Sequence, residues 1–146
     1  MLTAQNILDT TKRTHPKVWK NRSNVNFQHT SVKEWRDKKG RKVKTVKGKA
    51  FDRGSGSGRP HYLEIDYYGR GKSAQVWVTC DCEYFLFNCE VALWDEDSSN
   101  IKWSNGNDYQ SHGPNPEGAP RACKHIAHVL DMPGDKLPTS TNRRRQ

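Results

Sequence analysis

The placement of the cysteines constrains this chain more than any other feature. All four lie in two short segments: Cys80 and Cys82 form C-x-C with Cys89 seven residues later, and Cys123 forms C-x-H with His125. Two cysteines in C-x-C rarely bridge each other, because the ring would be too tight for unstrained disulfide geometry. They are good metal ligands where the chain kinks, because zinc–sulfur bonds of about 2.3 Å place two sulfurs about 3.8 Å apart. The spacing therefore favours a metal site.

The second pair, Cys123 and His125, lies at or near the start of a predicted helix. Residues i and i+2 of a regular helix point to opposite sides. We therefore expect Cys123 just before a helix or in its first, frayed turn, with His125 turned back to meet it, and Pro120 marks about where that helix starts. Cys80, Cys82, Cys123 and His125 would then form a closed Cys₃His site for one structural Zn²⁺.

Three nearby side chains leave alternatives open. Cys89 lies on an apolar helical stripe and is expected to pack in the core, although it can replace one of the four ligands. His128 can be a ligand only if His125 is not. Asp81, between two ligands, is expected to accept backbone N–H groups in the turn. A catalytic zinc needs an open coordination position, which Cys₃His lacks, so we expect no enzyme and no catalytic residues.

A metal would compensate for a thin core. The chain has 146 residues, the length of one domain, and only 32% of them are hydrophobic; the mean hydropathy is −1.05. Small cores rarely stabilise a domain alone. No apolar run approaches the ~18 residues that span a bilayer, and the N-terminus lacks the pattern of a secretory signal. We expect an intracellular protein with reduced thiols, which favours metal binding over disulfides.

The pattern of apolar residues predicts an α+β fold. Alternation of apolar and polar residues over 61–80 predicts a β-hairpin, and residues 33–51 read as a second, Lys-rich hairpin or as a turn–strand pair. Residues 82–94 change to helical period, and so do residues 123–132. We expect a small antiparallel sheet from about residue 32, followed by a zinc-clamped pair of helices, with extended basic arms at both ends.

The corresponding domain boundaries follow the composition. Residues 1–31 are predicted to be a basic N-terminal arm, although 3–13 can form a short helix with Ile7 and Leu8 on its buried side. Residues 32–133 are predicted to be the zinc-binding domain, with a polar, proline-containing insert at 95–120. Residues 134–146 are predicted to be a basic C-terminal tail.

The order of these elements resembles the SWIM-type zinc finger. The residues that carry the likeness are "HYLEIDYY…VWVTCDCEYF" and "CKHIAHVL", within residues 60–132. The stretch between Cys82 and Cys123 is long for that family, and Cys89 is additional. The segment "CDCEYFLFNCEVALW…IKWSNG…NP…CKHI" also resembles small uncharacterised proteins of tailed bacteriophages. That second resemblance implies a virion or morphogenesis component, located in the virion or the host cytoplasm.

The charge is strongly polarised along the chain. Residues 12–72 hold 18 Lys/Arg against 5 Asp/Glu, a net of +13, whereas residues 73–110 hold one base and seven acids, a net of −6. The basic part would bind an acidic protein surface or the phosphates of DNA or RNA, and its interleaved aromatics can stack on unpaired bases. These aromatics are Trp19, Phe27, Trp35 and Phe51. No base-reading helix is recognisable, which argues against sequence-specific DNA readout.

Two functions from different classes follow. The favoured one is a non-enzymatic, zinc-stabilised docking protein, a minor structural subunit of a phage virion or similar assembly, whose partners are other protein subunits. Trp19, Phe27 and Trp35 would be its apolar anchors. The alternative is a SWIM-type nucleic-acid-binding accessory protein that uses the basic N-terminal half. Neither function involves a membrane or a small-molecule substrate.

Overall fold

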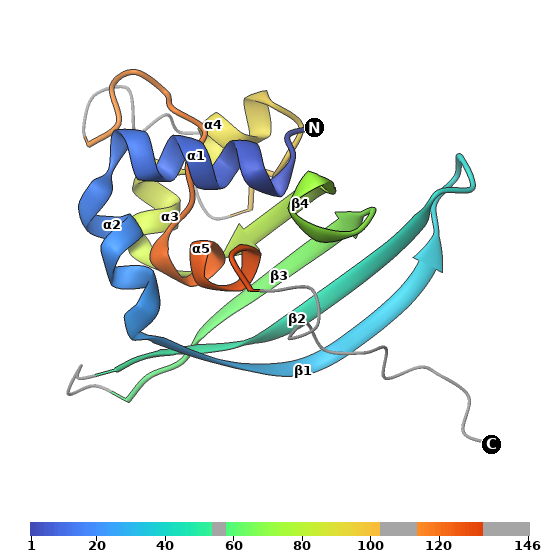
Figure 1. Ribbon diagram of the computed structural model, residues 1–146, viewed down its shortest axis with the longest axis horizontal. Helices are drawn as coiled ribbons and strands as arrows, with labels where there is room; N and C mark the ends of the chain where they lie inside the picture. The colour runs from blue at the N-terminus through green and yellow to red at the C-terminus, as the bar shows by residue number, and fades with distance from the viewer. Residues whose placement is uncertain (54–57, 103–113, 133–146) are drawn as a thin grey trace.

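The computed structural model describes residues 1–53, 58–102 and 114–132. It has an α+β fold in which helices lie against one face of a four-stranded sheet (Figure 1). The strands are β1 (Val25–Arg36), β2 (Lys42–Asp52), β3 (His61–Tyr68) and β4 (Gln75–Cys80). They are antiparallel and adjacent in chain order, β1-β2-β3-β4, so each connection is a hairpin.

The hairpin predicted across 61–80 is confirmed. β3 pairs with β4 so that Leu63 faces Cys80 and Tyr67 faces Val76. The alternating apolar side chains of both strands point to the helix-covered face, where they are buried. The period of two thus determines which face of the sheet forms the core.

The basic hairpin is longer than predicted, because its first strand begins at Val25 and not near residue 32. Its turn is closed by Asp37, whose Oδ1 accepts hydrogen bonds from the backbone N–H groups of Lys39 and Arg41, both at 2.9 Å. Gly48 lies inside β2, where a Cβ would come within 2.4 Å of Phe27 Cε1. Glycine is therefore required there by close packing, and not by a turn.

The N-terminal residues fold onto the domain. α1 (Ala4–Thr14) is capped by Thr3 in a capping box with Asn6 and buries Ile7 and Leu8, as its pattern predicted. α2 (Pro16–Asn21) and the 3₁₀ turn η1 (Arg22–Asn24) lead directly into β1. The structure therefore does not confirm an extended arm over residues 1–31.

The helical stripe predicted over 82–94 is buried but lies on two short helices. α3 (Glu83–Asn88) and α4 (Glu90–Asp95) are separated at Cys89, whose φ of −123° leaves the helical region. Phe85, Cys89 and Leu93 are all 0% exposed. The interruption keeps the same face of both helices on the core.

The last described helix, α5 (Lys124–Leu130), lies between the sheet and α1 (Figure 1). It contacts α1, α2 and three strands, β1, β3 and β4. This central position explains why His125, Ile126, Ala127, Val129 and Leu130 are all buried.

Several predicted features lie outside the described residues. They are residues 103–113 of the insert predicted at 95–120, and the C-terminal tail predicted at 134–146. Within the described ranges, no helix combines the length and apolarity needed to cross a membrane.

Candidate metal centre

The first pair of candidate ligands, Cys80 and Cys82, lies between the end of β4 and the start of α3. Cys80 is the last residue of β4, and Cys82 is the N-cap of α3. The Cys82 Sγ accepts a hydrogen bond from the backbone N–H of Phe85, 3.4 Å away. The thiol thus takes the place that a serine or aspartate oxygen usually has at a helix N-terminus, where exposed N–H groups favour negative charge.

The second pair uses the same device at the start of α5. Cys123 has extended backbone angles (φ −72°, ψ 167°) and is the N-cap. Its Sγ accepts a hydrogen bond from the N–H of Ile126, 3.5 Å away. His125 lies in the first helical turn, so the predicted geometry, with Cys123 just before the helix, is confirmed.

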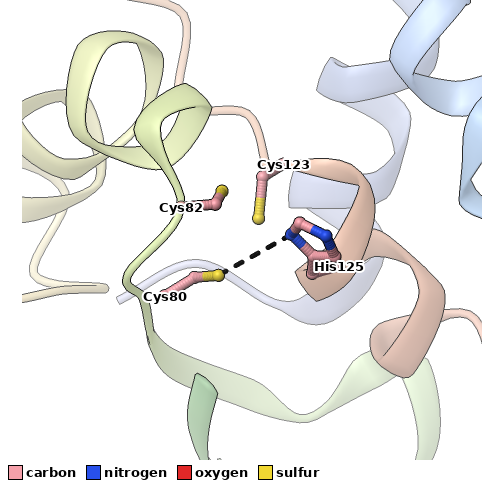
Figure 2. Close-up of side chains that lie close together, drawn as sticks. All are labelled: Cys80, Cys82, Cys123 and His125. Atoms are coloured by element: carbon pink, nitrogen blue, oxygen red, sulfur yellow. Dashed lines mark hydrogen bonds between the residues drawn. The ribbon is translucent and has the colours of Figure 1, made fainter. Parts of the chain in front are cut away.

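These four side chains meet in the interior of the protein. One ligand atom from each of Cys80, Cys82, Cys123 and His125 lies within 4.8 Å of all the others. None of the four residues is more than 5% exposed, and the cysteines are free thiols. Figure 2 shows the three sulfurs and the imidazole directed at a common point between β4, α3 and α5. The cluster can bind a metal ion.

The orientation of His125 identifies the nitrogen that faces the thiols. Its Nδ1 lies 3.9 Å from Cys80 Sγ, and its Nε2 lies 2.7 Å from the carboxylate Oδ1 of Asp52. Lys124 Nζ is 3.3 Å from the other oxygen of Asp52. A metal would be bound through Nδ1, while the Nε2–H donates to Asp52 and keeps the ring in that orientation. Sequence reasoning missed Asp52, because it ends β2 far from either ligand pair.

A second group of potential ligands, Asp52, His61 and His125, lies beside the first and shares His125 with it. The rings of His61 and His125 are 4.8 Å apart between centroids. His61 Nδ1 is 3.4 Å from Asp81 Oδ1, which also accepts the Tyr62 backbone N–H at 3.0 Å. Asp81 thus accepts a backbone donor as predicted, and His61 and Asp52 form a polar layer outside the thiols.

Within the cluster, the pKa values of the thiols and of His125 shift in different directions. Hydrogen bonds from Cys123 and Cys80 lower the pKa of Cys82 well below its ordinary value, against the effect of burial. Burial raises the pKa of Cys123. Burial acts to lower the pKa of His125, but its hydrogen bonds to Cys82 and Asp52 outweigh that effect and raise it. These shifts favour the thiolate form of Cys82 and the protonated form of His125, and a metal would displace protons on binding.

Neither of the alternative ligands joins the cluster. Cys89 is 0% exposed, and its Sγ points to the carbonyl of Tyr84, 3.9 Å away. His128 Nδ1 hydrogen-bonds to the carbonyl of Arg22, at 2.9 Å. Cys89 is a core thiol, as expected, and His128 ties α5 to η1.

The segment that delivers Cys123 is held by buried polar contacts that the sequence did not reveal. Thr11 Oγ1 accepts the backbone N–H of Ala122, at 2.9 Å. Arg121 is only 6% exposed, and its Nη2 donates to Asn88 Oδ1 at 2.7 Å and to the Pro114 carbonyl at 3.0 Å. These bonds connect the irregular chain before α5 to α1 and to α3, the helix whose N-cap is Cys82.

Comparison with known proteins adds no relative: no family model, curated protein or solved structure matches the chain. The functional argument therefore rests on the geometry of the described residues.

Proposed function

We propose that this chain is a non-enzymatic docking domain whose fold is held together by one structural Zn²⁺. The observation that carries the proposal is the buried group of Cys80, Cys82, Cys123 and His125, with ligand atoms within 4.8 Å of one another. Three thiolates and one imidazole are ligands that favour zinc among the common divalent ions. Four protein ligands leave no position for a substrate, which supports a structural role.

The position of the cluster suits a structural staple. It joins the end of β4 to the starts of α3 and α5. The starts of these two helices are about forty residues apart in the chain. Because metal binding requires all three segments together, its free energy contributes to folding. The N–H groups at the two helix starts and the Asp52 carboxylate would orient the ligands around the ion.

The docking part of the proposal rests on exposed aromatic side chains. Trp35 on β1 is 42% exposed, Phe87 on α3 is 38% exposed and Trp94 on α4 is 51% exposed. Aromatic residues are enriched where proteins bind one another. Of the anchors expected from the sequence, Trp19 and Phe27 pack against the core instead, so Trp35 is the one that keeps a large exposed surface. Subunits of a phage virion or a similar assembly would bind these positions.

Native mass spectrometry of protein purified without chelator tests the staple. We expect a mass increment of one zinc that is lost, together with cooperative unfolding, in the Cys80→Ser variant. The matched control is Cys89→Ala, which removes a buried thiol outside the cluster and should keep the zinc. A folded, metal-free wild-type chain would contradict the proposal.

The assembly role needs its own experiment. Quantitative mass spectrometry of purified particles from the source of the sequence should find the chain at a fixed copy number that survives a high-salt wash. Recovery of the chain only from the soluble fraction would contradict a structural subunit while leaving the zinc staple intact.

A second candidate function, nucleic-acid binding, is favoured by the basic β1–β2 hairpin. The hairpin continues past the helical layer (Figure 1), and residues 36–49 contain one acid, Asp37, among numerous bases. These bases are Arg36, Lys38, Lys39, Arg41, Lys42, Lys44, Lys47 and Lys49. Binding through phosphates predicts a linear fall of log affinity with log salt. A flat salt dependence with a single-stranded oligonucleotide would contradict this candidate.

A further inference from the structure

The Cys/His cluster does not explain a cavity at the other end of β3. It has a volume of about 550 Å³, and its lining includes Glu34, Lys44, Tyr67 and Arg70. Glu34 pairs with Lys44 across β1 and β2, and Lys44 pairs with Tyr67 across β2 and β3. Paired residues share a face, and Tyr67 belongs to the core. The cavity therefore lies on the helix-covered side of the sheet, below the basic hairpin.

Three cations line this cavity. Lys42 and Lys44 are two positions apart on β2 and so project to the same face, and Arg70 follows β3 in the turn before η2 (Gly71–Ser73). Among the residues that the structure describes, none of these three side chains forms an ion pair. The ion pairs found there join other residues. The described lining thus holds three cations against one carboxylate, Glu34, and carries an excess of positive charge.

The hydroxyl of Tyr67 adds a buried donor to the same cavity. Tyr67 is 4% exposed, and its hydroxyl has no hydrogen-bond partner in the described part of the chain. Burial raises the pKa of this hydroxyl, so it stays protonated and can donate. A buried donor without an acceptor is costly, and a ligand oxygen in the cavity would supply the acceptor.

We propose that this cavity is a binding site for a phosphate-bearing ligand, with Lys42, Lys44, Arg70 and the Tyr67 hydroxyl as the groups that hold the phosphate. A phosphate group offers several acceptor oxygens and up to two negative charges, which suits three cations and a hydroxyl better than a single carboxylate does. The volume is in the range of sites for nucleotide-sized ligands. The phosphate can come from a free nucleotide or from a nucleic-acid backbone.

This site is independent of the metal proposal. Its residues lie on β2, on β3 and in the β3–β4 connection, and none of them is a residue of the Cys/His cluster. The zinc-loaded full chain is therefore the correct material for the test, and native mass spectrometry of each variant confirms that its zinc is retained.

Calorimetric titration of the zinc-loaded chain with four probes tests the proposal. The probes are inorganic triphosphate, ATP, a short oligothymidylate and a glutamate peptide of matched charge. We expect phosphate probes to bind and the glutamate peptide to bind at least about 10-fold more weakly, because it lacks the phosphate geometry. Strongest binding of ATP identifies a nucleotide site, and strongest binding of the oligothymidylate identifies a nucleic-acid site.

Two matched double variants localise the site. Lys44→Gln with Arg70→Gln should weaken binding of the best probe about 10-fold or more, because charge-assisted hydrogen bonds are lost. Lys38→Gln with Lys39→Gln removes the same charge from the hairpin turn, outside the cavity lining, and should change affinity less than about 3-fold. Equal losses in the two double variants would overturn the proposal, because they would show diffuse attraction to the hairpin.

Tyr67→Phe provides the readout that a structural role would not give. The variant removes only the hydroxyl, which has no partner in the described chain, so the melting temperature of the unliganded protein should not fall. Binding of the best phosphate probe should nevertheless weaken about 5-fold. A lower melting temperature with unchanged affinity, equal binding of the glutamate peptide, or no binding of any phosphate probe would overturn the proposal.

Discussion

The two ends of β3 carry polar groups in opposite ways. At the Cys/His cluster, the thiols and His125 are buried, and hydrogen bonds connect them to the N–H groups at two helix starts and to Asp52. At the distal cavity, Lys42, Lys44 and Arg70 have no ion-pair partner among the described residues, and the Tyr67 hydroxyl is unsatisfied. Satisfied buried groups stabilise a fold, whereas unsatisfied groups around a cavity indicate what a ligand would supply.

The comparison explains why a chain with so few apolar residues can hold an open basic hairpin. The core, the helices and the metal ligands are concentrated on one part of the sheet (Figure 1). The β1–β2 hairpin extends beyond that part and is rich in lysine, which also discourages pairing with other chains. The proposed zinc staple and the proposed phosphate site thus lie in different regions, and each region can be perturbed separately.

Removing the metal is the strongest way to test this separation. Chelation should lower the melting temperature more than any single substitution below, because structural zinc contributes about 10–16 kcal/mol of apparent binding energy in zinc-finger peptides. Hydrogen–deuterium exchange should increase most in α3 and α5 and least at the turn between β1 and β2, which exchanges fast already. Adding zinc back should restore the protection. An increase confined to the hairpin would contradict the division.

Arg121→Ala should have the next largest effect, although the residue binds no metal. It removes the donors to Asn88 Oδ1 and the Pro114 carbonyl, and buried acceptors left unpaired cost about 1–3 kcal/mol each. We expect a loss of about 2–4 kcal/mol in the free energy of unfolding of the zinc-loaded protein, measured with urea. The control Arg53→Ala, at an exposed position, should change it by less than about 0.5 kcal/mol. Equal effects would show that the buried network is unimportant.

Arg121 also illustrates what the sequence could not reveal. The strands over 61–80 and the four ligands were predictable, because alternation and the C-x-C and C-x-H spacings are local patterns. The helix interruption at Cys89 was not, because the apolar stripe continues through it. Arg121 was read as one more basic residue, since its burial depends on Asn88 and Pro114, which are brought to it only by tertiary structure.

Asp52 and the distal cavity were missed for the same reason. Asp52 meets His125 through the pairing of β2 with its neighbours, across 73 residues of chain. Lys44 on β2 and Arg70 in the connection after β3 line the same cavity. A signal for the cavity was present in the dense lysines of residues 42–49, but their alternation between two faces of β2 hides which ones converge. The extended N-terminal arm is not confirmed, because α1 packs on the domain through the buried side chains of Ile7 and Leu8.

Asp52→Asn tests the metal end more finely. The substitution keeps the shape but weakens the hydrogen bond that orients His125, and loss of such a partner typically reduces metal affinity about 10–100-fold. Competition with a chelator of known affinity measures the change, and the fold should persist at saturating zinc. Asp131→Asn is the control, because it removes a carboxylate at the C-terminal end of the same helix, where it pairs with Arg22 and Lys72 and with none of the Cys/His side chains. Equal zinc affinity in wild type and Asp52→Asn would show that Asp52 has no part in the site.

The smallest effect concerns Asp131, which joins the end of α5 to η1 and η2 through Arg22 and Lys72, at 2.9 and 2.8 Å. Burial acts to raise its pKa, but the hydrogen bonds from Lys72 and Arg22 outweigh burial and lower it. A lowered folded-state pKa means that the carboxylate stabilises the fold above its unfolded pKa of about 3.9 and loses that contribution as pH falls through the folded value.

Asp131→Asn should therefore cost about 1 kcal/mol or less, as expected for partly exposed ion pairs. Urea unfolding of wild type and variant from neutral pH downward should give a constant difference to about pH 5, followed by a decrease below about pH 4. Over the same range the metal centre should weaken in both proteins alike, because protons compete with zinc for the thiolates. A difference that grows as the pH falls would mean that Asp131 is stabilised by burial of its neutral form. In that case its contacts with Arg22 and Lys72 would not be what joins α5 to the turns beside it.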